Sequence, residues 1–380
     1  MDFEFSDTQQ MLIDSASRLM NDHSGVEVWR ERRHLVDGCD PAVWSQFADM
    51  GWLALAVPED AGGLGGAMED VALLMVELGR GIATDPVVST AVLATHVIDR
   101  LAQGEMREKM LGAIATGELR MALAHDEADD RYELDRERAT VARRTAEGYL
   151  LNGRKLMALD APSAHQLLVT TSLEGEQGYG IFLVSADAQG LSQKTYPLVD
   201  GTRAADLDLV DVVVPGDCLL GSGASAVETL QVAIDRATVA LMAQAVGAME
   251  KAVSIAADYA KERKQFGQPI GKFQAIQHMA AEMFVSAYQA RSALYQMLAH
   301  MDGPTSERNR AIAMARVIIA EAGRRVSNHG VQIHGGYGVT DEYAISHYFR
   351  RLFSLEKQYG DEQYHLARLA KMGSAETYGS

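Results

Sequence analysis

At 380 residues the chain is too long for one small hydrophobic core, and it is expected to form two or three packed units. Its 47% hydrophobic and 23% charged residues are ordinary for a soluble globular protein. A net charge of −17 argues against a nucleic-acid partner, and two cysteines predict neither a disulfide framework nor a metal site.

The first part of the chain, residues 1–119, predicts helices. Apolar residues from Phe5 to Leu19 recur at roughly helical spacing, and Ser6 or Asp7 is the expected N-cap. Acidic residues begin at position 2 and no apolar core follows a basic start, so no secretory signal is expected.

Residues 120–222 predict strands. Short β-prone runs alternate with turn residues, and Glu147-Gly148 and Asn152-Gly153 are the predicted turns, the second as a hairpin. Several short strands within one such stretch indicate a compact β-barrel or sandwich.

Residues 223–380 predict a helical bundle with segments at 226–262, 271–301, 306–333 and beyond 340. The most apolar stretch, Ala237 to Met249, spans 13 residues, which is too short to cross a membrane and predicts a buried helix. We therefore expect a cytoplasmic protein without a membrane partner.

Two motifs in this helical region suggest a nucleotide site. Arg263-Lys264-Gln265-Phe266-Gly267 is a basic turn between two helices, and an arginine can bind phosphate oxygens through two parallel hydrogen bonds. Farther on, Gln332 offers an amide and Gly335-Gly336 lets a ligand approach the backbone. Taken singly, each motif also fits an ordinary helix end, with a cation near the dipole or a glycine cap.

Together, in this order and context, the two motifs resemble the flavin-binding signature of the acyl-CoA dehydrogenase family over essentially the whole chain. The resemblance implies an α+β fold with an N-terminal helical domain (1–119), a middle β-barrel domain (120–222) and a C-terminal four-helix bundle (223–380). It also implies FAD as the cofactor and no metal. The implied FAD-binding residues are Arg263, Gln265, Phe266, Gln332, Gly335 and Gly336, some of them acting across a subunit interface.

The catalytic glutamate of that family is missing. Tyr359 stands at its usual position, and Ala237 stands near the alternative position used by some members. Asp361 is the candidate base within this chain and Asp235 the second choice, although Asp361 also fits the N-cap of a following helix.

The middle domain departs from the family as well. Met157-Ala158-Leu159-Asp160 and Ala124-His125-Asp126-Glu127 replace the segments that line the flavin ring. This combination resembles paired-subunit members, closest to the pimeloyl-CoA dehydrogenase small-subunit type and the related steroid enzymes. It implies α,β-dehydrogenation of an acyl-CoA thioester, with a paralogous partner in an α2β2 complex or else a homo-oligomer, and an electron-transferring flavoprotein as acceptor.

Two alternatives remain open. The chain could be a non-catalytic structural subunit of such a complex, as the missing glutamates would allow. It could also be a flavoenzyme of the same fold with another substrate, such as a flavin monooxygenase or a nitroalkane oxidase.

Overall fold

A computed structural model describes residues 5–128, 132–174 and 178–378, with side chains up to residue 373. Internal contacts divide the chain into two compact units. One unit comprises residues 1–31, 68–83 and 238–380, and the other comprises residues 32–67 and 84–237. Residues 1–4, on which the expected lack of a secretory signal partly depends, lie outside the described ranges.

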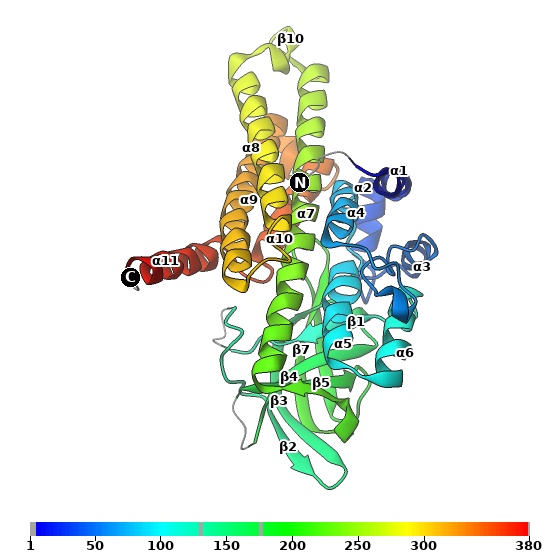
Figure 1. Ribbon diagram of the computed structural model, residues 1–380. Coiled ribbons are helices and arrows are strands. Elements are labelled where there is room, and N and C mark those ends of the chain that lie inside the picture. The colour runs from blue at the N-terminus through cyan, green and yellow to red at the C-terminus, as the bar shows by residue number, and fades with distance from the viewer. Residues whose placement is uncertain (1–4, 129–131, 175–177, 379–380) are drawn as a thin grey trace. The chain divides into compact units, whose positions relative to one another are not determined.

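The N-terminal region is helical, as predicted (Figure 1). Ser6 is the N-cap of the first helix: its hydroxyl accepts a hydrogen bond from the Gln9 amide, 3.2 Å away, and the Gln9 side chain accepts one from the Ser6 amide. The helices are α1 (Asp7–Asp22), α2 (Val26–Arg32), α3 (Pro41–Asp49), α4 (Met68–Arg80), the π-helix η2 (Val88–Ala94), α5 (Thr95–Leu101) and α6 (Gly104–Ala115).

The middle region forms one eight-stranded sheet, which confirms the predicted β domain. The order is β6-β7-β3-β2-β4-β5-β8, and β1 pairs with β4 in parallel. Wholly buried side chains such as Leu151, Leu167 and Phe182 form its core. The strands are β1 (Met121–Ala124), β2 (Val141–Thr145), β3 (Gly148–Leu159), β4 (Gln166–Leu173), β5 (Tyr179–Ser185), β6 (Leu191–Pro197), β7 (Arg203–Val214) and β8 (Leu219–Ser222).

One of the two predicted turns is wrong. Glu147-Gly148 does lie where β2 turns into β3, but Asn152-Gly153 lies inside β3. At that point the register between β3 and β7 shifts between Leu151 and Gly153, which is a bulge. A Cβ on Gly153 would come within 2.6 Å of the Thr140 Cα, so the glycine allows a close backbone approach and not a reversal of the chain.

The apolar stretch at 237–249 belongs to a helix far longer than predicted. Helix α7 (Gly223–Glu262) has 40 residues. Among the described residues it is the one helix long and apolar enough to cross a membrane, but 72% of its most apolar window is buried within the protein, as in the core helix of a globular protein. Helix α4 packs closely on it, because a Cβ on Gly247 would meet the Val76 carbonyl oxygen at 1.9 Å.

The remaining helices complete the bundle, and the last predicted segment is in fact two helices. Helices α8 (Gln274–Leu298) and α9 (Thr305–His334) pack side by side (Figure 1), and the short helix η6 (Gly335–Val339) follows α9. Helices α10 (Ala344–Lys357) and α11 (Glu362–Tyr378) are separated at Tyr359 and Gly360, whose φ angles are +54° and +118°. Neither angle is compatible with a continuous helix.

Candidate functional site

The connection between α7 and α8 is a tight hairpin of the short strands β9 (Lys264–Gln265) and β10 (Gln268–Pro269). Phe266 and Gly267 occupy the two turn positions with φ of +52° and +79°, as a two-residue hairpin turn requires. Phe266 is 91% exposed in a backbone conformation that is unfavourable for a phenylalanine. Strained residues of this kind cluster at functional sites, which makes the turn a candidate binding segment.

Arg263 stands directly before this hairpin, at the end of α7. Its amide donates to the Tyr259 carbonyl oxygen at 2.8 Å, and its own carbonyl oxygen accepts from the Ile270 amide at 2.8 Å. The main chain of Arg263 is therefore fixed on both sides of the turn. Among the described residues its guanidinium forms no ion pair, so its charge is available to a ligand.

The end of α9 lies beside this turn. Gly335 caps the helix with a φ of +61°, and its amide donates to the carbonyl oxygens of Val331 and Gln332. A Cβ on Gly335 or on Gly336 would meet no atom within 4 Å, so open space lies in front of both residues. The glycine pair thus leaves the backbone accessible to a ligand.

A hollow of about 470 Å³ joins the two motifs. Four of the predicted residues, Arg263, Gln265, Gly335 and Gly336, line it. The other two, Phe266 and Gln332, are exposed residues outside its lining, and their predicted contact with a nucleotide across a subunit interface stays a prediction. The remaining lining residues are Tyr259, Ile270, Ile333, His334, Tyr337 and Thr340.

Aromatic rings form the wall of the hollow. The His334 imidazole stacks on Tyr259 with ring centroids 4.1 Å apart, and its Nδ1 lies 2.8 Å from the Gly330 carbonyl oxygen. Burial lowers the pKa of His334, so the ring is neutral at pH 7 and donates from Nδ1. Burial likewise raises the pKa of the Tyr259 hydroxyl, which stays protonated.

This set of groups suits a nucleotide with a diphosphate. A guanidinium, a side-chain amide and accessible glycine amides can bind phosphate oxygens, and the rings offer faces for stacking. The residues of this half of the predicted site therefore fit FAD.

The candidate bases have other partners. The Asp361 Oδ1 accepts a hydrogen bond from the Tyr364 amide at 2.9 Å, so Asp361 caps the N-terminus of α11. Asp235 is 2% exposed, and its Oδ1 accepts from the Gln231 amide group at 2.9 Å. The two lie in different units, Asp361 with residues 238–380 and Asp235 with residues 84–237. A catalytic role for either one stays a prediction.

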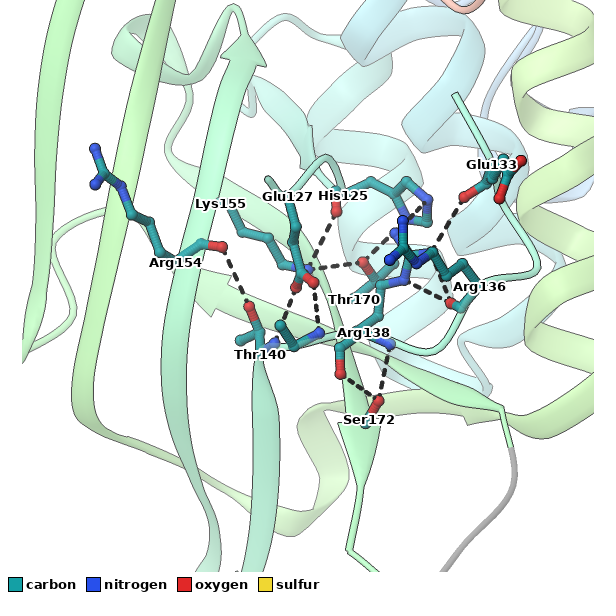
Figure 2. A network of polar contacts seen from close by, with 11 residues as sticks. His125, Glu127, Glu133, Arg136, Arg138, Thr140, Arg154, Lys155, Thr170 and Ser172 are labelled. Carbon is teal, nitrogen blue, oxygen red and sulfur yellow. Dashed lines mark hydrogen bonds and ion pairs between the residues drawn. The ribbon is translucent and has the colours of Figure 1, made fainter. Parts of the chain in front are cut away.

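The segments expected to line the flavin ring belong to the sheet domain, where His125 and Ala158 are buried and Met157 is 41% exposed. Figure 2 shows a buried network around Lys155, which is wholly buried and whose Nζ lies 2.5 Å from the Glu127 Oε1. The same Nζ donates to the His125 carbonyl oxygen at 3.2 Å. Glu127 in turn accepts a hydrogen bond from the Thr140 amide at 3.0 Å. These contacts hold both ends of the connection between β1 and β2 on the sheet.

His125 lies between two cations in this network. Its Nε2 accepts from the Arg138 guanidinium at 3.2 Å, and its Nδ1 lies 3.0 Å from the Thr170 hydroxyl. Burial first, and then the charges of Arg138 and Lys155, lower its pKa well below the usual value. His125 is therefore a neutral interior residue engaged in hydrogen bonds on both ring nitrogens.

The second ring-side segment is also engaged internally. Met157 and Asp160 have φ angles of +48° and +60°, and the Ser89 hydroxyl donates to the Asp160 carboxylate. At the start of this segment stands Met157, which offers no aromatic face to a flavin ring. The ring-side residues of this chain therefore do not fit the flavin contacts of the typical family member.

Comparisons with known proteins agree with the fold. The model of the acyl-CoA dehydrogenase N-terminal domain matches residues 6–118, and the model of the C-terminal domain matches residues 221–373. The chain is 30% identical over 315 residues to a 3-(aryl)acrylate reductase of Clostridium sporogenes, covering 80% of this chain and 82% of the relative.

Solved structures of paired complexes are also similar. A variant of the Tcur3481-Tcur3483 steroid ACAD matches with a TM-score of 0.86 and 30% identity, over 98% of this chain and 99% of that chain. The ChsE4-ChsE5 complex of Mycobacterium tuberculosis matches with a TM-score of 0.88 and 26% identity, over 98% of this chain and 99% of that chain. Structures with FAD, such as PigA with FAD and proline, share the fold at 22% identity.

Proposed function

Because the chain belongs to the acyl-CoA dehydrogenase family, we propose that it is one subunit of a FAD-dependent enzyme that oxidises an acyl-CoA thioester to the trans-2-enoyl-CoA. The partner is a paralogous subunit in an α2β2 complex located in the cytoplasm, and an electron-transferring flavoprotein accepts the electrons. FAD bound in such a complex would take up the hydride that leaves the β-carbon.

The hollow between the α7–α8 turn and the end of α9 carries the proposal. Arg263 would neutralise the FAD diphosphate, Gln265 would donate its amide, and Gly335 and Gly336 would let the cofactor approach the backbone. Phe266 and Gln332 would contact the nucleotide where a second subunit completes the site. Retention of this hollow argues against a chain that has abandoned the cofactor.

The rest of the chemistry is assigned to the partner. Tyr359 stands where the family has its base, and the carboxylate of Asp361 caps a helix. The segments expected beside the flavin ring are engaged in the interior network around Lys155. A partner that supplies both the glutamate and the ring contacts would complete a site shared between unlike subunits. Asp361 remains the candidate base if this chain supplies one.

A second candidate function is a structural subunit that takes no part in the chemistry. The tyrosine at position 359 favours it. The two functions differ in whether removal of the phosphate-binding group at Arg263 affects the flavin of the complex.

The visible spectrum of the purified protein tests the proposal. The chain would be purified alone and also with its co-expressed partner, and each sample titrated anaerobically with acyl-CoA thioesters. We expect flavin absorbance in the complex and bleaching by a suitable thioester. The expected Arg263→Ala phenotype is a loss of flavin from the complex, whereas the structural-subunit alternative predicts unchanged flavin content. Flavin that no thioester bleaches would favour a flavoenzyme with another substrate.

A further inference from the structure

The guanidinium of Arg263 lies over an aromatic ring. The centre of its guanidinium lies 5.5 Å from the centroid of the Tyr337 ring. A cation within about 6 Å of a ring centroid is attracted by the negative charge on the ring face. Since Arg263 directly follows α7 and Tyr337 belongs to η6, this contact joins the two motifs of the site directly.

Further rings support Tyr337. Its ring centroid lies 4.9 Å from that of Tyr343, and Tyr343 meets Tyr259 edge-on at 6.1 Å. Tyr259 in turn stacks on His334. We call these four residues, Tyr259, His334, Tyr337 and Tyr343, the aromatic brace. It runs from the last turn of α7 to the start of α10, and Tyr259, His334 and Tyr337 line the hollow.

Packing of a hydrophobic core does not account for Tyr337. Its side chain is 45% exposed, and it lines the hollow. Burying its ring therefore contributes less to folding than burying a core aromatic would. What the ring does provide is a defined place for a long arginine side chain that otherwise samples many rotamers.

We propose that Tyr337 is a positioning residue that holds the Arg263 guanidinium over the hollow before the anionic ligand arrives. This inference rests on the proposed function, in which that ligand is the FAD diphosphate. An arginine already in its binding conformation loses less freedom when it binds phosphate, so the affinity for FAD increases. The other rings of the brace keep Tyr337 in place.

A double-mutant cycle on FAD affinity tests the proposal. The complex with the partner subunit would be stripped of flavin and titrated with FAD, with binding followed by flavin fluorescence. Tyr337→Leu is expected to weaken binding about fivefold. Tyr337→Phe keeps the ring face and is expected to stay within about twofold of the parent. In the Arg263→Ala background, Tyr337→Leu should have no further effect.

Controls separate positioning from folding. Tyr288→Leu removes an exposed tyrosine of α8 outside the hollow and should leave FAD affinity unchanged. Thermal unfolding of each apo-complex shows whether a variant is folded, and Tyr337→Gln replaces the leucine variant if that one is not.

The outcomes are distinct. Tyr337 does not act through Arg263 if Tyr337→Leu lowers FAD affinity equally in the parent and in the Arg263→Ala background. The same conclusion follows if Tyr337→Phe binds FAD as weakly as Tyr337→Leu does. Unchanged affinity in Arg263→Ala would contradict the FAD assignment of the hollow itself, and the inference with it. If Arg263→Ala lowers FAD affinity and Tyr337→Leu does not, the inference is overturned and the proposed function stands.

Discussion

Asp361 illustrates how one side chain can fit two roles. Its carboxylate oxygen accepts a hydrogen bond from the Tyr364 amide, which lies in the first turn of α11. An N-cap residue makes this hydrogen bond to an amide that has no partner within the helix. The capping contact therefore favours a structural role for Asp361 over a catalytic one.

The substitution Asp361→Asn separates the two roles, because asparagine caps helices about as well as aspartate but cannot take up a proton. We expect the variant complex to keep its thermal stability and its dehydrogenase turnover. Asp361→Ala is the matched variant and should lower stability by about 1 kcal/mol through loss of the cap. A turnover reduced by more than about a hundredfold in Asp361→Asn, with normal stability, would instead identify Asp361 as the base.

At the scale of elements, a buried arginine fixes the connection between α10 and α11. Arg316 of α9 is 1% exposed, and its guanidinium donates to the carbonyl oxygens of Glu356 and Gln358 at 3.0 Å, and also to that of Gly360. These carbonyl groups lie at or past the end of α10 and lack helical partners. The left-handed conformation of Tyr359 is held in place by these bonds.

Replacing this arginine should loosen the connection. Arg316→Met keeps the length of the side chain but leaves several buried carbonyl groups without donors, so the free energy of unfolding should fall by about 3 kcal/mol. Arg325→Met on the same helix is the control, since Arg325 pairs with Glu321 at an exposed site and should change stability by less than about 0.5 kcal/mol. Urea denaturation would measure both. Similar losses in the two variants would contradict the role of Arg316.

His365, at the start of α11, makes this connection sensitive to acid. Burial first, and then the charges of Arg316 and Arg368, lower its pKa from 6.5 to about 2. Below pH 6.5 the unfolded chain therefore binds a proton that the folded chain does not. The stabilisation by the neutral ring is complete above this pH and is lost progressively as the pH falls toward 2.

The pH dependence of stability checks this assignment. Between pH 7 and pH 5, His365 should account for about 2 kcal/mol of the loss in unfolding free energy. His365→Leu removes that contribution. The unfolding free energy of this variant should therefore fall less steeply than the parent's as the pH is lowered from 7 to 5, whatever the variant's stability at pH 7. Parallel curves for the parent and the variant would show that His365 is not buried as a neutral ring.

At the scale of the whole molecule, the two halves of the proposed cofactor site differ. The nucleotide half keeps the Arg263 cation and accessible glycine amides. The ring-side segments are engaged in interior contacts within residues 84–237. Under the proposed function, association with the partner subunit would complete the site.

Native mass spectrometry tests that association. Co-expressed with its paralogue, the chain should form a complex with two copies of each subunit, and this complex should carry the flavin. The chain alone, at 41.3 kDa per subunit, should bind FAD weakly or not at all. A homo-oligomer that binds FAD at full occupancy without the partner would contradict the shared site.

The order of helical region, β domain and bundle was predictable because periodicity and turn residues report local structure directly. Ser6 as an N-cap and the two cofactor motifs followed from short patterns of this kind. Local patterns failed where distant contacts decided the outcome, as at Asn152-Gly153. This pair lies in a bulge of β3 against β7, with Thr140 close to Gly153, and not in the expected hairpin turn.

The composition of the site depended on tertiary structure. Arg263 and Gly335 lie more than seventy positions apart in the sequence, and only the packing of the bundle brings them to one hollow. The roles of Tyr337 and Tyr343 could not be predicted, since a tyrosine beside a glycine cap has no sequence pattern of its own. The sequence by itself determined the family and the chemistry of the groups proposed to bind phosphate. Only the fold decided which side chains surround them, because contacts between distant segments depend on the packing of complete elements.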